Sequence, residues 1–455
     1  MQSDPGPVVS RVLRSLLVET KDGEWGAGEA DSDTIAMRVI RGTDFDDARQ
    51  LDLTTVPVRH VAQRHAARKA LRAGDVLIET AGGSKGRPTG RTVFLREDLF
   101  RGSELPVTCA SFARYMRFDT ALVEPEFAYW WLQSIYQSGR IETYQVQHSG
   151  IARFQFTKFA DEVLMPLPDR WVQRLVAETL GSIERRMTLL RQTNATFESI
   201  AQALFKSWFI DFDPVRAKAE GRDPEGMDAA TAALFPAEFV DSEQGPVPKG
   251  WTVQPIGDLV DAVGGSTPDT KNEAFWEPAV HHWTSPKDLS GATAPVLLDT
   301  ERKVSDAGLA RISSGLLPVG TLLMSSRAPI GYLSLSLVQV AINQGYIAMP
   351  PGGRLPPEYM YFWCKLNMDA IKGRANGSTF MEISKKAFRP IPALLPSPEV
   401  VNRFHDFATT VFSRITANER QARALSELRD TLLPRLISGK LQLPELQALR
   451  EEALA

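Results

Sequence analysis

Residues 170–210 read RWVQRLVAETLGSIERRMTLLRQTNATFESIAQALFKSWFI, a long stretch with regularly spaced apolar positions. These positions follow alternating steps of four and three residues, the heptad spacing of a coiled coil rather than the broader stripe of a surface helix. The seam comprises Val176, Leu180, Ile183, Met187, Leu190, Asn194, Phe197, Ala201, Leu204 and Trp208. Because Pro166 and Pro168 come just before the stretch, we predict one helix from about Arg170 to Ile210.

A second stretch with the same spacing predicts a helix from about Pro398 to Ile437, and Pro398 suits a first helical turn. Its seam comprises Phe404, Ala408, Val411, Ile415, Asn418, Ala422, Leu425, Arg429, Leu432 and Leu436. Arg429 is the charged exception, and we expect its head group to reach water near the end of the helix.

The two seams match if the helices pair antiparallel with paired residue numbers that sum to 612. Asn194 then lies opposite Asn418, and a buried amide pair costs stability but fixes the register. The seam from Val176 to Trp208 corresponds to roughly 50 Å of helix. This arrangement predicts a rigid strut with a globular domain at each end. The alternative is that each helix packs on its own domain.

The chain also contains two diverged copies of one pattern. Residues 74–81 are similar to residues 320–327, and residues 125–132 are similar to residues 357–364. Gly150 with residues 156–158 matches Gly377 with residues 383–385. The offsets of 246, 232 and 227 residues differ as loop lengths differ between copies. In each copy short strand-like runs precede the long helix. The expected fold is therefore α+β, with two mixed α/β domains separated by two long antiparallel coiled-coil helices.

This duplication predicts the domain boundaries. They are a first domain over 1–168, a central helix over 169–212, a linker over 213–245, a second domain over 246–397, a C-terminal helix over 398–440 and a tail over 441–455.

Composition indicates a globular protein of the reducing cytoplasm. Of 455 residues, 43% are hydrophobic and 24% charged, and no apolar run reaches the roughly 20 residues of a membrane helix. The N-terminus lacks a signal-peptide pattern. Cys109 and Cys364 have no metal-binding spacing and are expected to be buried apolar side chains.

No catalytic centre is visible in the sequence. There is no phosphate-binding loop, no NPPY-like tetrapeptide for a flipped base, and no glycine-rich turn for a methyl donor. The six histidines show no ligand spacing. We therefore expect no catalytic residue, no metal and no cofactor bound by this chain. A nuclease site without a recognisable motif remains the alternative.

Several polar loops have the residue types that bind nucleic acid. The net charge is −3, yet residues 61–117 contain eleven Lys or Arg against five Asp or Glu. Arg, Asn and Gln read base edges, whereas Ser and Thr mostly position the backbone. A plain surface loop is the alternative for each candidate. The candidate DNA contacts are Lys85, Arg87, Arg91, Ser149, Arg153 and Lys158 in the first copy, and Lys287, Ser325, Ser326, Arg327, Asn343, Gln344, Ser378, Thr379 and Lys385 in the second.

Several stretches resemble the specificity subunits of type I restriction–modification systems. Residues 203–222 (ALFKSWFIDFDPVRAKAEGR) and 234–253 resemble the central conserved region of that family, and 431–441 (TLLPRLISGKL) its distal conserved region. The segments WTSPKDL at 283–289, SSRAPIGY at 325–332 and NQG at 343–345 are similar to its second variable domain. Residues 1–160 match less well and lack the usual Pro-Lys-Gly-Trp opening.

The resemblance implies two target-recognition domains, each reading half of a bipartite sequence in double-stranded DNA. It also implies that the helices dock two modification subunits, which bind S-adenosylmethionine and methylate adenine. Two restriction subunits that use ATP and Mg²⁺ would complete the complex. Trp208 and Phe209 leave the seam as an apolar cluster and are candidate docking residues, with packing against their own domain as the alternative. A free-standing DNA-binding protein is the competing function.

Overall fold

The computed structural model describes residues 9–83, 87–149, 151–242, 245–377 and 381–439. The chain divides into two compact units. Unit 1 comprises residues 1–188 and 423–455, and unit 2 comprises residues 189–422. Each unit therefore includes part of both long helices.

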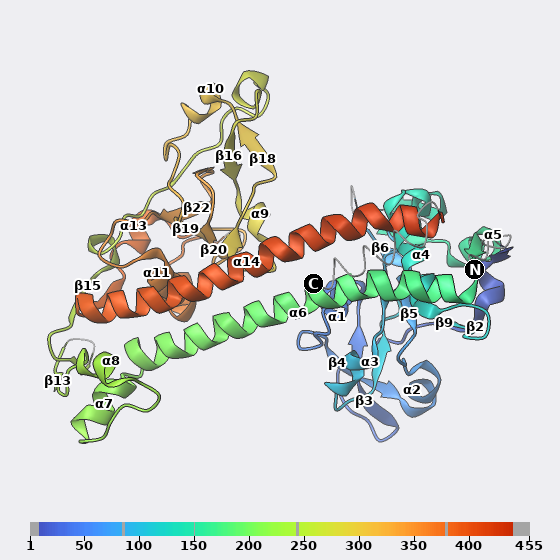
Figure 1. Cartoon of the computed structure of the whole chain (residues 1–455), viewed down its shortest axis with the longest axis horizontal. Coiled ribbons are helices and arrows are strands. Elements are labelled where there is room, and N and C mark those ends of the chain that lie inside the picture. Colours follow the sequence, from blue (N-terminus) through green and yellow to red (C-terminus); the bar gives the residue numbers. More distant parts are fainter. Residues whose placement is uncertain (1–8, 84–86, 150, 243–244, 378–380, 440–455) are drawn as a thin grey trace, which may run out of the picture. The chain divides into compact units, whose positions relative to one another are not determined.

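The two long helices form where the heptad spacing predicts them. Helix α6 spans Arg170–Phe209 and helix α14 spans Pro398–Ile437, each without interruption (Figure 1). Pro398 occupies the first turn of α14, where its missing N–H costs no helical hydrogen bond.

Within unit 2 the helices pair antiparallel in the predicted register. Asn418 Nδ2 donates to Asn194 Oδ1 at 2.8 Å, and the rings of Trp208 and Phe404 lie 6.1 Å apart. Both pairs of residue numbers sum to 612. The amide of Asn194 is almost fully buried, and its nitrogen also lies 3.5 Å from Ile415 O. The apolar seam thus carries one satisfied amide pair, as the sequence predicts.

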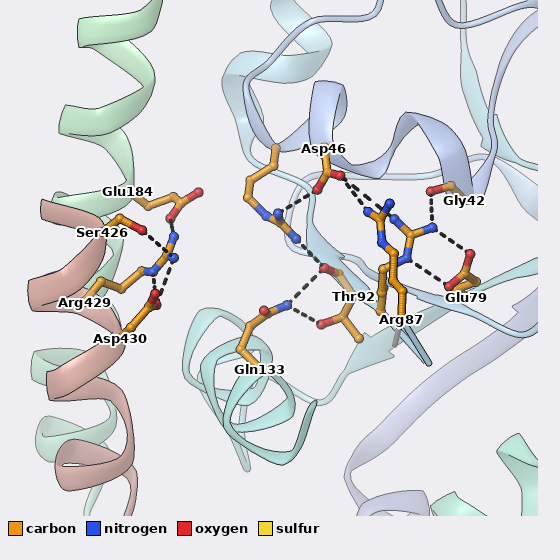
Figure 2. A network of polar contacts seen from close by, with 12 residues as sticks. Gly42, Asp46, Glu79, Arg87, Thr92, Gln133, Glu184, Ser426, Arg429 and Asp430 are labelled. Atoms are coloured by element: carbon orange, nitrogen blue, oxygen red, sulfur yellow. Dashed lines mark hydrogen bonds and ion pairs between the residues drawn. The ribbon is translucent and has the colours of Figure 1, made fainter. Parts of the chain in front are cut away.

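Within unit 1, Arg429 binds a partner on α6 that the sequence did not identify. Its Nη1 lies 2.8 Å from the carboxylate of Glu184 on α6, and the Glu184 side chain is only 6% exposed. Asp430 and Ser426 accept further hydrogen bonds from the same guanidinium (Figure 2). The Arg429 side chain is 19% exposed, and a buried carboxylate from the facing helix binds its guanidinium.

Unit 1 contains a four-stranded antiparallel sheet in the order β2–β9–β5–β7 and a three-stranded sheet in the order β4–β3–β8. In the smaller sheet β3 pairs antiparallel with β4 and parallel with β8. The strands are β2 (Leu17–Asp22), β9 (Ala113–Phe118), β5 (Val76–Glu79), β7 (Thr92–Phe94), β4 (Val58–Ala62), β3 (Thr34–Ile40) and β8 (Val107–Cys109). Two smaller sheets pair β1 (Val9–Val12) with β12 (Leu164–Leu167), and the hairpin β10 (Gln145–Ser149)–β11 (Ile151–Phe154) with β6 (Ala81–Gly82).

Short helices complete unit 1. They are α1 (Phe45–Arg49), α2 (Gln63–Lys69), α3 (Glu97–Arg101), α4 (Pro125–Gln137) and α5 (Phe156–Glu162). Helix α4 buries a run of aromatic side chains that includes Phe127, Trp130 and Trp131. A fully buried strand, β5, lies at the centre of the main sheet and contributes Leu77 to the core. Apolar burial of this kind is the main stabilising contribution in a domain of this size.

Unit 2 repeats this topology. β19 (Leu322–Ser325) pairs antiparallel with β20 and β22, as β5 does with β7 and β9. β16 (His281–Thr284) pairs antiparallel with β18 and parallel with β21, as β3 does with β4 and β8. The further strands are β20 (Leu333–Ser336), β22 (Tyr346–Met349), β18 (Arg302–Val304), β21 (Val340–Ile342), β17 (Val296–Leu297), β13 (Phe239–Val240), β14 (Val247–Pro248), β15 (Thr252–Pro255) and β23 (Pro392–Leu395). The shared pairing of these strands supports duplication, although the fourth strand of the main sheet differs: β17 pairs parallel with β20, whereas β2 pairs antiparallel with β9.

The helices of unit 2 are α7 (Asp213–Ala219), α8 (Ala229–Ala233), α9 (Pro286–Leu289), α10 (Asp306–Leu309), α11 (Pro357–Leu366), α12 (Met368–Lys372) and α13 (Lys385–Phe388). The segment predicted as a linker, 213–245, contains α7, α8 and β13. Val215 and Phe235 from this segment are buried in the main core of unit 2.

The third sequence match between the copies is wrong by two residues. The Phe154 N–H donates to Thr80 O at 2.9 Å, and the Ile383 N–H donates to Ser326 O at 3.0 Å. Thr80 and Ser326 are equivalent in the first match, so Ile383 corresponds to Phe154 rather than to Phe156. Here the backbone hydrogen bonds define which residues of the two copies are equivalent, whereas residue similarity near the start of the short helix does not.

The Asn pair allows a stability test within the seam. We expect Asn418→Leu alone to lower the free energy of unfolding by about 1–3 kcal/mol, because the buried Oδ1 of Asn194 then loses its donor. The double variant Asn194→Leu/Asn418→Leu should be at least as stable as the wild type, because both amides leave an apolar seam. Denaturant unfolding of the three proteins measures both effects. A double variant less stable than the single one would contradict this account.

Candidate nucleic-acid interface

In unit 2, three segments meet at Ser326. Its N–H donates to Gly345 O at 2.8 Å, its carbonyl accepts from Ile383, and Arg327 forms an antiparallel bridge with Glu382. We call this surface the three-segment edge of unit 2. Its described residues are 325–327, 343–345, 376–377 and 381–383. The edge therefore unites predicted DNA contacts that lie far apart in the sequence.

Two candidate side chains extend from this edge. Gln344 is exposed, and its Oε1 accepts from Thr267 Oγ1 at 2.7 Å. Arg327 is partly exposed, and its Nη1 lies 3.6 Å from the Glu382 carboxylate. An ion pair of this length at the surface contributes little to stability, so it can give way to a phosphate or a base edge.

Asn343 and the two serines have structural roles. Asn343 Oδ1 accepts from the Gly345 N–H at 2.8 Å and so shapes the turn between β21 and β22. The side chains of Ser325 and Ser326 are buried, which corrects their prediction as DNA contacts. Ser325 Oγ donates to Pro329 O at 2.7 Å and accepts from the Tyr332 N–H at 2.8 Å, which holds the loop after β19 in place.

Two lysines complete the second-copy candidates. Lys287 on α9 is exposed and lies 2.7 Å from Glu301, whose hydrogen bond raises the pKa of Lys287. Lys385 is exposed in the first turn of α13, just after the three-segment edge. Both amino groups remain candidates for phosphate contacts.

Unit 1 has an equivalent edge centred on Thr80. The Thr80 N–H donates to Phe112 O at 2.8 Å, and Thr80 O accepts from the Phe154 N–H. Arg153 on β11 lies opposite Ala81 on β6. The three-segment edge of unit 1 comprises residues 80–82, 110–112, 145–149 and 151–154. Arg153 is exposed there, and so is Lys158 on the adjoining helix α5.

Arg91 is not an available DNA contact. Its Nη2 lies 2.7 Å from Glu79 Oε1 and 2.7 Å from Gly42 O, and its Nε lies 3.0 Å from Glu79 Oε2. The Arg91 side chain is only 14% exposed. Burial lowers the pKa of Arg91, but the hydrogen bond and charge of Glu79 outweigh it, so that the pKa is raised overall. Arg91 anchors its strand in the domain, which corrects the sequence prediction.

Arg87 fits the prediction better. More than half of its side chain is exposed, and its Nη2 lies 3.0 Å from the exposed carboxylate of Asp46 (Figure 2). This pair is weak in water and leaves the guanidinium accessible.

Four candidates cannot be placed. Lys85, Ser378 and Thr379 lie outside the described residues. Ser149 belongs to β10, but its side chain also lies outside the described part of the chain.

The predicted docking residues are buried. Trp208 and Phe209 are 5% and 3% exposed. Trp208 stacks edge-on against Phe235, and Phe209 packs against Phe404 and Tyr359. These rings form the core of unit 2, so they do not form an exposed patch. The sequence could not distinguish the two cases, because an apolar cluster at a helix end suits either.

The described residues contain neither a metal-binding cluster nor a membrane-spanning helix. No group of three or more His, Cys, Asp or Glu residues there is placed to hold a metal ion. No helix in the same part of the chain is long and apolar enough to cross a bilayer.

Comparisons with known proteins agree with one another. A family model described as the type I restriction modification DNA specificity domain matches residues 248–425. The HindI specificity subunit of Haemophilus influenzae is 27% identical over 82% of this chain and 88% of its own length. The MjaIX specificity subunit of Methanocaldococcus jannaschii is 34% identical over 36% of this chain and 38% of its own.

One crystal structure shares the fold. It is the S subunit of a type I restriction–modification system from M. genitalium, with 15% identity and a TM-score of 0.54. The likeness covers 96% of this chain and 98% of that one.

Proposed function

We propose that the chain is a DNA specificity subunit of a type I restriction–modification system, and that each unit reads one half of a bipartite DNA target. The observation that carries this proposal is the duplicated edge. Thr80 in unit 1 and Ser326 in unit 2 join the same three segments through the same hydrogen bonds. Two equivalent edges in one chain suit a target with two separate parts.

The exposed side chains of the two edges suit both kinds of DNA contact, those to phosphates and those to base edges. Arg153 and Lys158 in unit 1 and Lys385 in unit 2 supply positive charge for phosphates. Gln344 and Arg327 have the amide and guanidinium groups that bind base edges with paired hydrogen bonds. A net charge of −3 favours binding through such local sites rather than through the whole surface.

We further propose that the long helices dock two modification subunits. Because Trp208 and Phe209 are buried, the outer face of α6 is the better candidate surface. Leu189 and Ile200 are 54% and 51% exposed there, and residues eleven apart lie on nearly the same side of a helix. S-adenosylmethionine would belong to those partners, and ATP and Mg²⁺ to restriction subunits. This chain would act in the cytoplasm of a prokaryote and would neither methylate nor cut DNA alone.

Half-site assignment tests the proposal. We expect the variant Arg327→Ala/Gln344→Ala, assembled with its modification subunits, to relax one half of the methylated sequence. Each lost base contact should cost about 1–3 kcal/mol of discrimination. The other half should stay unchanged, because it is read by the edge of unit 1. Methylation profiling of plasmid DNA measures both halves at once.

Arg354→Ala is a suitable control, because Arg354 is an exposed cation of unit 2 outside the edge. A change in both halves together would contradict independent reading. Tight, specific binding by the chain without any partner would favour a free-standing DNA-binding protein. Metal-dependent cleavage by the lone chain would indicate a nuclease.

A further inference from the structure

Phe112 is an exposed aromatic residue on the three-segment edge of unit 1. Its side chain is 61% exposed, although the residues that follow it in β9 are largely buried. It was not among the residues that the sequence singled out, because an isolated Phe before a strand usually belongs to a core.

The duplication identifies the counterpart of this turn. The Thr80 N–H donates to Phe112 O and the Ser326 N–H donates to Gly345 O, both at 2.8 Å. Residues 110–112 of unit 1 therefore correspond to residues 343–345 of unit 2. The same equivalence holds at the start of each turn. The Ala110 N–H donates to strand β3, and the Asn343 N–H donates to strand β16.

The two turns differ in chemistry. Unit 2 has Asn343 and Gln344, whereas unit 1 has Ala110, Ser111 and Phe112. A Cβ atom added at Gly345 would lie 3.0–3.1 Å from atoms of Pro286 and Asn343. In unit 2 these two side chains therefore already occupy the space beside this position. In unit 1 the same position places a large ring in solvent. The two edges therefore offer different groups to their ligands at equivalent places.

The surroundings of Phe112 indicate what covers it. Arg153 lies on the same edge, and Lys158 lines one surface hollow together with Thr80, Arg114 and the carboxylates of Asp22, Asp161 and Glu162. Arg153 and Lys158 are exposed and form no ion pair among the described residues. Exposed cations on and beside the edge that bears this exposed apolar ring suit a polyanion that also has an apolar group, and DNA has one in the major groove, the C5 methyl of thymine.

We propose that Phe112 contacts a thymine methyl group in the half-site read by unit 1. This inference rests on the proposed function. It adds a specificity-determining residue that acts by apolar contact, in place of the hydrogen bonds that Gln344 offers in unit 2. It also predicts that the half-site of unit 1 contains an A·T pair at the position beneath this turn.

Uracil substitution tests the contact, because uracil pairs like thymine but lacks the methyl group. The full chain, assembled with its modification subunits, is titrated with target duplexes in which each thymine of that half-site is replaced in turn. At one position the wild type should bind the uracil duplex about fourfold more weakly, as expected for one buried methyl group. Phe112→Ala should bind the thymine duplex about tenfold more weakly and show no preference at that position. Its salt dependence should match the wild type, because no charge is lost.

Val18→Ala is the matched control. Val18 is also 61% exposed, but it lies on β2 near the opposite end of β9. It should leave both duplexes bound as by the wild type. Sequence-specific binding that tolerates uracil at every position would overturn the methyl contact and leave the proposed function standing. A Phe112→Ala complex that keeps the wild-type preference for thymine over uracil would also overturn it. A wild-type complex without sequence-specific binding would overturn the proposed function itself.

Discussion

Replacing Arg91 by alanine should lower the free energy of unfolding of unit 1 by about 3–5 kcal/mol, because it leaves a buried carboxylate without its partner. Glu79 is 4% exposed and takes two hydrogen bonds from the Arg91 guanidinium. Desolvation of Glu79 would then be uncompensated. Thermal and denaturant unfolding of the chain measure the loss, and limited proteolysis locates it in unit 1.

Arg87→Ala is the matched control, because it removes a cation from the same loop region. Its pair with Asp46 is exposed on both sides, so its stability should change by less than about 1 kcal/mol. If Arg87 contacts a phosphate, the slope of log affinity against log salt should fall by about one. Equal stability losses in the two variants would contradict the distinction between anchor and contact.

Replacing Arg429 by methionine should cost about 3–5 kcal/mol for the same physical reason. The Glu184 side chain is 6% exposed, and its carboxylate would remain buried beside the seam without the Arg429 guanidinium. Burial lowers the pKa of Arg429, while the hydrogen bond to Asp430 and the charge of Glu184 outweigh it, so that the pKa is raised. The pair is thus mutually stabilised within unit 1.

The double variant Arg429→Met/Glu184→Leu should recover most of this loss, because an apolar pair suits a heptad seam. Asp430→Ala should cost at most about 1 kcal/mol, since Asp430 is 46% exposed. Denaturant unfolding of the wild type and these three variants measures the differences. If the double variant were as unstable as Arg429→Met, the loss would come from packing and not from an unpaired charge.

Local patterns in the sequence were sufficient for the helices and the duplication. Helix α6 begins at the predicted Arg170, and α14 begins and ends at the predicted Pro398 and Ile437. Heptad spacing depends only on residues a few positions apart, so it can be read without knowing the partner. The Asn194–Asn418 pair followed from the same spacing, because each seam has a single Asn and one antiparallel register brings the two amides together.

The roles of individual polar side chains depended on residues that are distant in the sequence. Arg87 and Arg91 are both cations after a glycine-rich turn, yet only Arg91 meets the buried Glu79 of β5. Trp208 is buried because Phe235 packs against it after the chain leaves α6. Burial and charge pairing depend on residues that are neighbours in space, and a heptad or a loop motif does not identify those residues.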